Sequence, residues 1–127
     1  MSKIKGSKAE RELVRLLWGA NWAAVRVAGS GSSHFPCPDI VARNRQRTVG
    51  IECKVTKENK KYFYPDEIDQ LKEFCGRFGA EPWIAVKFKG GEWRFVMLED
   101  LKQTGSSWLI DEWVARNKGL SFSELTE

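Results

Sequence analysis

The chain is short and rich in hydrophobic residues. It has 127 residues, of which 42% are hydrophobic and 12% aromatic, which favours one compact domain with its own core over two independent domains. No stretch approaches the roughly 20 apolar residues that span a bilayer, and residues 1–7 lack the apolar centre of a secretory signal. We therefore expect a soluble, intracellular protein of the cytoplasm, without a membrane partner.

Charge divides the chain into two unlike halves. The net charge is +4, but residues 1–61 carry thirteen Lys or Arg against five acidic residues, whereas residues 62–127 carry eight against twelve. A basic region of this kind is typical of proteins that bind a polyanion. A solvated surface of mixed charge is the alternative interpretation.

The cysteines and the histidine show no metal-binding spacing. Cys37, Cys53 and Cys75 form neither a C-x-x-C pair nor a pattern with His34, the only histidine. An odd number of cysteines without such spacing indicates reduced thiols rather than a disulfide framework or a zinc site.

The first predicted helix covers residues 8–19 and follows a basic arm at residues 1–7. Leu13, Leu16 and Leu17 recur at helical spacing and give the helix an apolar stripe. Ser7, followed three residues later by Glu10, resembles a capping box at the start of the helix. Glu10 therefore has two interpretations, as a helix-capping group or as a contributor to an active site.

A short strand and a flexible loop come next. Residues 23–28 alternate as a strand, with Val25 and Val27 on one side and Arg26 on the other. The Gly-Ser run over residues 29–33 ends this strand. Its amides and hydroxyls suit contact with phosphate or with a metal-bound water, although such runs are more often linkers. Because the run is neither G-x-G-x-x-G nor a P-loop, we expect no nucleotide cofactor.

The central feature is a predicted β-hairpin over residues 38–54. Hydrophobic residues at positions 49, 51, 53 and 55 alternate with Glu52 and Lys54, which should share the other face. The polar residues 44–47 indicate a turn centred between Arg45 and Gln46. That turn pairs Asp39 with Glu52 across an antiparallel ladder, and paired side chains point to the same face.

The remaining chain supplies further elements. Basic residues 57–61 lead into three aromatics at 62–64, a combination that suits phosphate contact by the lysines. Asp66 is positioned to cap a second helix that ends at Gly79. Two strands within residues 82–98 flank Lys89-Gly90-Gly91 and predict a second hairpin in the same sheet. The tryptophan-bearing tail at about 104–127 indicates either a dimerisation surface or ordinary core packing.

Three carboxylates and one lysine define a possible chemistry. Asp39 and Glu52, with Glu10 as a third member, are the oxygen ligands that a hard divalent cation prefers. Lys54 can orient an attacking water or stabilise charge on a scissile phosphate. The residues therefore predict metal-assisted phosphodiester hydrolysis. The alternative is a surface hairpin in which Asp39 enters a turn and Glu52 and Lys54 form an exposed charge pair.

The sequence resembles the PD-(D/E)xK nucleases through Glu10, Pro38-Asp39 and Glu52-Cys53-Lys54. The segments GSKAERELVRLL, VRVAGSGSS, PDIVARN and IECK are similar to those of the archaeal Holliday junction resolvases. The resemblance is densest over residues 6–54, weakens through the helix that contains Gln70 and Leu71, and fades in the tail. It implies an α/β protein whose restriction-endonuclease-like central mixed β-sheet is flanked by helices, with residues 1–127 forming a single nuclease domain.

The resemblance also implies an activity and its residues. It implies a homodimer that binds a four-way DNA junction and makes paired nicks with Mg²⁺, for which Mn²⁺ can substitute. The implied catalytic residues are Glu10, Ser30, Asp39, Glu52 and Lys54, the implied metal ligands are Glu10, Asp39 and Glu52, and the DNA-binding residues are Arg11, Arg26, Ser30, Ser32, Lys57, Lys60 and Lys61. Cys53 alternates away from the site and is assigned to the core. A nuclease that cleaves ordinary duplex and a noncatalytic junction-binding protein are the alternatives.

Overall fold

The computed structural model describes residues 3–29 and 34–127 of the chain. Its elements, in chain order, are α1 (Lys3–Gly19), β1 (Ala23–Arg26), β2 (Ile40–Arg43), β3 (Thr48–Thr56), β4 (Lys60–Phe63), α2 (Pro65–Phe78), β5 (Glu81–Phe88), β6 (Arg94–Met97), the 3-10 turn η2 (Leu98–Asp100), β7 (Lys102–Thr104), β8 (Ser107–Asp111), α3 (Glu112–Asn117) and α4 (Phe122–Thr126). Within this part of the chain, no helix is both long enough and apolar enough to cross a membrane.

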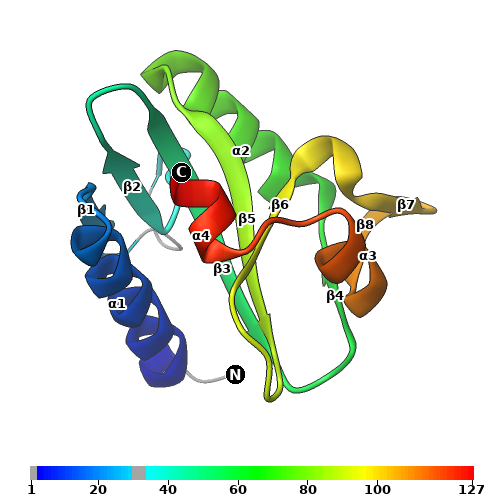
Figure 1. Cartoon of the computed structure of the whole chain (residues 1–127). Helices are drawn as coiled ribbons and strands as arrows, with labels where there is room; N and C mark the ends of the chain where they lie inside the picture. Colours follow the sequence, from blue (N-terminus) through cyan, green and yellow to red (C-terminus); the bar gives the residue numbers. More distant parts are fainter. Residues whose placement is uncertain (1–2, 30–33) are drawn as a thin grey trace.

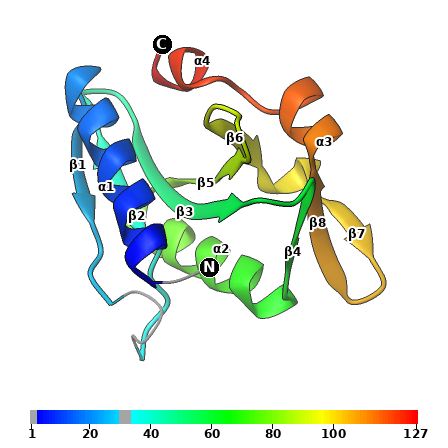
Figure 2. The same ribbon diagram turned by 90° about the horizontal axis from the view of Figure 1, so that it is seen from below.

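A central mixed sheet organises the molecule (Figure 1). Its strand order is β1-β2-β3-β5-β6, in which only the β3–β5 pair is parallel. Helix α1 covers one face and α2 the other, as the view turned by 90° shows (Figure 2). A second sheet, with strand order β4-β8-β7, lies at the side of the first. The predicted mixed sheet flanked by helices is confirmed.

Two hydrophobic cores lie on opposite faces of this sheet. One contains Leu13 and Leu17 of α1 with Ile51 and Cys53 of β3. The other contains the buried residues of α2, such as Leu71. Because side chains alternate along a strand, Glu52 and Lys54 point to the α2 face, opposite to Ile51 and Cys53. The site residues of β3 therefore share a face with the second core.

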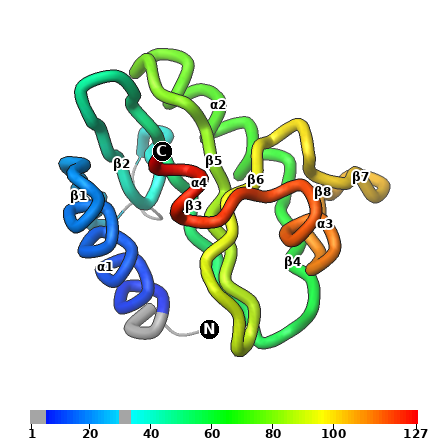
Figure 3. The backbone as a smooth tube through the Cα atoms, viewed as in Figure 1, coloured from blue at the N-terminus to red at the C-terminus, as the bar shows by residue number. Residues whose placement is uncertain are grey.

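The hairpin of β2 and β3 follows the predicted register, and its course is clear in the backbone trace (Figure 3). Ile40 pairs with Ile51 and Arg43 with Thr48, so the turn is centred between Arg45 and Gln46 as predicted. Asn44 fixes the turn, because its Oδ1 accepts hydrogen bonds from the amides of residues 46 and 47 at 2.8 and 2.7 Å. Such self-capping is typical of Asn in turns.

Both predicted helix starts are wrong. Helix α1 begins at Lys3, so Ser7 and Glu10 lie inside it rather than at its first turn. Their side chains turn to Arg26 of β1 instead of the helix backbone. Helix α2 begins at Pro65, with Tyr64 at its N-cap in place of Asp66. Proline suits the first helical position because its missing N–H needs no partner there.

The other local predictions for this region are confirmed. Gly79 ends α2 in the left-handed conformation, with φ of 78°, which glycine adopts without steric cost. Strands β5 and β6 pair antiparallel around the loop that contains Gly90 and Gly91. All three cysteines are free thiols, and Cys53 is buried in the first core, as expected.

The tail packs largely into its own chain. Ile110, Val114 and Leu125 are buried, and β8 pairs with β4 to build the second sheet. Residues 60–63, predicted only as a basic and aromatic stretch, thus become a strand because a partner lies nearly fifty positions later. Trp113 is the large tail side chain that stays exposed, at 57%.

Candidate active site

Asp39 stands at the entrance to β2. Its backbone N–H donates to the carbonyl of Ile51 at 3.0 Å, and its Oδ2 accepts from the amide of Cys53 at 2.8 Å. The register continues to place Asp39 opposite Glu52, which brings the two carboxylates to one side of the strand pair. The carboxylate of Asp39 is buried, so the fold fixes its position before any ligand binds.

Burial and neighbouring charge act strongly on Glu52. The pKa of this carboxyl rises from 4.5 to about 8, chiefly because burial removes the carboxylate from solvent and also because the negative charge of Asp39 lies nearby. The ammonium of Lys54 opposes the change but does not cancel it. Near neutral pH the metal-free site therefore keeps a proton on Glu52, and a bound cation would have to displace that proton.

Lys54 is held between two carboxylates on the α2 face. Its Nζ lies 3.7 Å from Oε2 of Glu52 and 3.0 Å from Oε1 of Glu67. The ring of Phe63 lies 5.7 Å from the same nitrogen. Burial acts to lower the pKa of Lys54, but the two carboxylates outweigh it and raise the pKa above its usual value. Lys54 is thus a charged group that the carboxylates of Glu52 and Glu67 hold in one orientation.

Glu10 approaches the site from the opposite face. Its Oε1 accepts from Nε of Arg26 at 2.9 Å, and the same guanidinium donates to Oγ of Ser7 at 2.8 Å. Burial raises the pKa of Glu10, as does the charge of Asp39, although Arg26 lowers it. The charge of Asp39 therefore raises the pKa of both Glu10 and Glu52. Glu10, however, is paired with Arg26.

Glu10 is separated from the other two carboxylates as a possible metal ligand. Among the residues that the structure describes, no group of three or more His, Cys, Asp or Glu side chains is arranged to hold a metal ion. Glu10 belongs to α1, whereas Glu52 points to the α2 face. The chemistry of Asp39 and Glu52 still fits a hard divalent cation, which completes its shell with waters and substrate oxygens.

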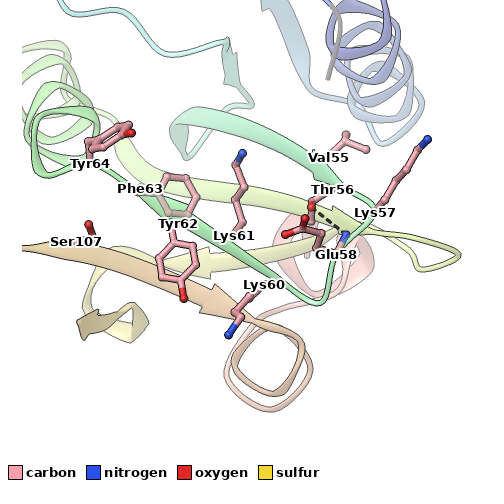
Figure 4. A pocket seen from close by; sticks show the side chains of 10 residues that line it. All are labelled: Val55, Thr56, Lys57, Glu58, Lys60, Lys61, Tyr62, Phe63, Tyr64 and Ser107. Atoms are coloured by element: carbon pink, nitrogen blue, oxygen red, sulfur yellow. Dashed lines mark hydrogen bonds between the residues drawn. The ribbon is translucent and has the colours of Figure 1, made fainter. Parts of the chain in front are cut away.

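The predicted DNA-binding residues fall into separate groups. Arg11 is exposed on α1, and Arg26 is engaged with Ser7 and Glu10. Lys57, Lys60 and Lys61 line one hollow of about 780 Å³ (Figure 4). Ser30 and Ser32 lie outside the described residues.

Glu67 is the site residue that sequence reasoning missed. It lies at the third position of α2, where its side chain accepts from the backbone amide of Tyr64. A Glu two positions after a Pro that opens a helix is a capping signal. That signal predicts the cap but not the contact with Lys54, which depends on α2 packing against β3.

The fold and the site define a class of protein. A mixed sheet flanked by helices, with Pro38-Asp39 beside one strand and Glu52-x-Lys54 on the next, is the arrangement of a PD-(D/E)xK nuclease with a restriction-endonuclease-like fold. A family model described as archaeal Holliday junction resolvase (hjc) matches residues 1–127. The chain belongs to this archaeal Holliday junction resolvase family. Membership implies the use of a divalent metal ion.

Individual relatives agree with the family match. A crossover junction endodeoxyribonuclease Hjc of Archaeoglobus fulgidus is 47% identical over 110 residues, which cover 87% of this chain and 81% of that protein. A crossover junction endodeoxyribonuclease Hje of Saccharolobus solfataricus is 41% identical over 102 residues, 78% of this chain and 76% of that protein. The 1.6 Å structure of Archaeoglobus fulgidus Hjc, a Holliday junction resolvase, has a TM-score of 0.90 and 43% identity, and covers 96% of this chain and 100% of that one.

Proposed function

We propose that this protein is a structure-specific endonuclease that resolves four-way DNA junctions by phosphodiester hydrolysis. The observation that carries the proposal is the hairpin register, which sets Asp39 opposite Glu52 with Lys54 on the same face. The proteins that the chain resembles are named as crossover junction endodeoxyribonucleases. The two cores share one central sheet, which supports a single nuclease domain over residues 1–127.

Each site residue then has a chemical role. Asp39 and Glu52 would hold Mg²⁺, for which Mn²⁺ can substitute, with Glu10 nearby as a further acidic group. The metal would supply Lewis acid chemistry to the scissile phosphate and a more acidic water. The Lys54 ammonium would orient the attacking water or stabilise the charge that develops on the phosphate. The Cys53 amide keeps the Asp39 carboxylate in place.

The basic hollow supports contact with DNA close to this site. It is lined by Val55, Thr56, Lys57, Glu58, Lys60, Lys61, Tyr62, Phe63, Tyr64 and Ser107. Lys60 and Tyr62 leave β4 on one side and Lys61 and Phe63 on the other (Figure 4). Lys61 thus lies on the same side of β4 as Phe63, whose ring lies beside Lys54, so a DNA strand bound by Lys61 would pass close to the carboxylates.

Salt dependence tests this hollow. Replacing Lys57, Lys60 and Lys61 by Gln should weaken binding of junction and duplex alike, since both DNAs present the same phosphate backbone. The slope of log K against log salt should become shallower by about 0.9 for each phosphate that the variant no longer neutralises. An unchanged slope would show that the lysines of this hollow do not contact DNA phosphates.

A homodimer suits a junction because a two-fold axis duplicates the site and a four-way junction presents equivalent strands. Exposed apolar side chains indicate one surface through which this homodimer could form. Two hollows share Phe78, which is 55% exposed: one also contains Trp18 and Val25, and the other Phe35 and Phe74. Contiguous apolar surface of this kind marks an interaction site, and we assign it to a second copy of the chain.

Sedimentation of two variants separates this surface from the tail. Phe78→Asp should convert a dimer into a monomer, whereas Trp113→Asp, which alters the exposed tryptophan of the tail, should leave the dimer intact. The reverse result would place the dimer contact within residues 104–127, and a monomeric unmodified protein would refute the dimer.

The cleavage experiment compares a labelled four-way junction with linear duplex of matching sequence, with and without Mg²⁺. Paired nicking of the junction alone is expected. Equal cleavage of the duplex would favour a restriction-like or repair nuclease, and binding without cleavage in Mg²⁺ or Mn²⁺ would make the protein a noncatalytic junction-binding module.

Two variants test the residue roles. Asp39→Asn and Lys54→Ala should bind the junction as the unmodified protein does and lose cleavage by about 100-fold or more. Loss of cooperative unfolding in both would show that these side chains hold the fold instead.

A further inference from the structure

Lys54 has a carboxylate partner outside the strand that carries it. Its Nζ is closer to Oε1 of Glu67, at 3.0 Å, than to Oε2 of Glu52, at 3.7 Å. Glu67 comes from helix α2, thirteen positions after Lys54. The proposed catalytic lysine is therefore tied to a second element of the fold.

The start of α2 fixes the Glu67 carboxylate. Its Oε2 accepts from the backbone N–H of Tyr64 at 2.9 Å, while the N–H of Glu67 donates to the carbonyl of Tyr64 at 3.1 Å. Pro65 restricts the backbone between them. One carboxylate oxygen is thus used by the helix cap, which leaves the other directed at Lys54.

A lysine side chain is long and flexible, so it needs partners to hold one orientation. Glu52 alone would draw the ammonium against a carboxylate that is proposed to bind metal. Glu67 provides an opposing anion, and the Phe63 ring, 5.7 Å from Nζ, limits the remaining space. With both anions present, the ammonium is held between the strand and the helix.

We propose that Glu67 is a positioning residue for the cleavage reaction, which it serves by holding Lys54 in its working orientation through the α2 capping box. This inference rests on the proposed nuclease function. Glu67 does not touch the reacting phosphate in this role. Two rival roles are a helix cap without influence on Lys54 and a direct metal ligand.

Substitution to Gln separates the capping role from the charge. Glutamine also serves at the third position of a capping box, so Glu67→Gln keeps the helix start and removes the anion beside Lys54. Asp66→Asn is the matched control, since Asp66 is exposed in the same first turn of α2. Glu67→Asp retains the charge on a shorter side chain.

The experiment uses the full chain and a four-way junction at saturating protein. For each variant it measures the single-turnover cleavage rate, the Kd for the junction, the Mg²⁺ concentration at half-maximal rate and the thermal midpoint. Glu67→Gln should slow cleavage about 10- to 100-fold, as loss of an orienting partner typically does, with the junction Kd, the Mg²⁺ midpoint and the thermal midpoint unchanged. Glu67→Asp should recover part of the rate, and Asp66→Asn should cleave normally.

Other outcomes overturn the proposal in identifiable ways. Normal cleavage by Glu67→Gln would make Glu67 a cap alone, and a rate restored by higher Mg²⁺ would make it a metal ligand. An equal loss of cleavage rate in Asp66→Asn would indicate a general effect of removing negative charge from the start of α2. An unmodified protein that cleaves neither junction nor duplex would instead refute the nuclease function itself, and this inference with it.

Discussion

Glu52→Gln should stabilise the metal-free protein at pH 8 and leave its stability nearly unchanged near pH 4.5. The prediction follows from the proton that Glu52 keeps in the fold. Burial, followed by the charge of Asp39, raises the pKa of this carboxyl from 4.5 to about 8. Between these two values the folded protein retains a proton that the unfolded chain has lost.

The sign follows from proton linkage. Where the folded state binds more protons than the unfolded state, the free energy of unfolding falls as pH rises. The loss begins near pH 4.5 and is complete above pH 8, at about 1.4 kcal/mol for each pH unit. The loss attributable to Glu52 therefore reaches most of its limit of about 5 kcal/mol by pH 8. Glutamine cannot ionise, so the variant escapes this loss.

Urea unfolding in the presence of a chelator measures the difference at pH 5, 6.5 and 8. The advantage of Glu52→Gln should grow steadily over this series. Glu124→Gln is a control of opposite sign, because the backbone amide of Ser121 lowers the pKa of the Glu124 carboxyl. Its removal should not stabilise the protein at pH 8. A Glu52→Gln variant with the same advantage at every pH, or with none, would refute the reasoning.

Three further predictions concern stability. Gly50→Ala would place a Cβ atom 2.6 Å from Sγ of Cys75, so urea unfolding should show a loss of about 1–3 kcal/mol, most of which the added Cys75→Ala substitution should recover. Arg47→Ala removes two hydrogen bonds to Glu81, at 2.9 and 2.8 Å, and one to the carbonyl of Leu125 at 2.6 Å, and should cost about 1–3 kcal/mol. Arg47 also lowers the pKa of Glu81 through this hydrogen bonding, so the stability that the pair supplies is present above pH 4.5 and should be lost as acid protonates the carboxylate.

Matched substitutions control for these effects. Nothing lies within 4 Å of a Cβ added at Gly76, so Gly76→Ala in the α2 interior should gain about 0.5–1 kcal/mol. Arg77 is 82% exposed and lies 3.6 Å from its partner Glu73, so Arg77→Ala should cost less than about 0.5 kcal/mol. Equal losses at positions 47 and 77 would contradict the account of Arg47, and independent effects at 50 and 75 would contradict the steric account of Gly50.

Local patterns were sufficient for the centre of the site. The alternation through β3 placed Glu52 and Lys54 on one face, and the polar turn at residues 44–47 fixed the pairing of Asp39 with Glu52. The glycine that ends α2 and the hairpin of β5 and β6 were likewise predictable from neighbouring residues. Each of these features depends on residues that lie close together in sequence, where period and turn chemistry act directly.

Only the tertiary structure decided which distant groups meet that centre. Ser7 and Glu10 look like a capping box, yet they contact Arg26 because α1 extends past them and packs against β1. Residues 60–63 become a strand because β8 pairs with them, and Glu67 reaches Lys54 because α2 packs on the face of β3 where that lysine lies. The sequence by itself determined the acidic pair and its lysine through local periodicity, while packing between elements far apart in the chain decided what surrounds and orients them.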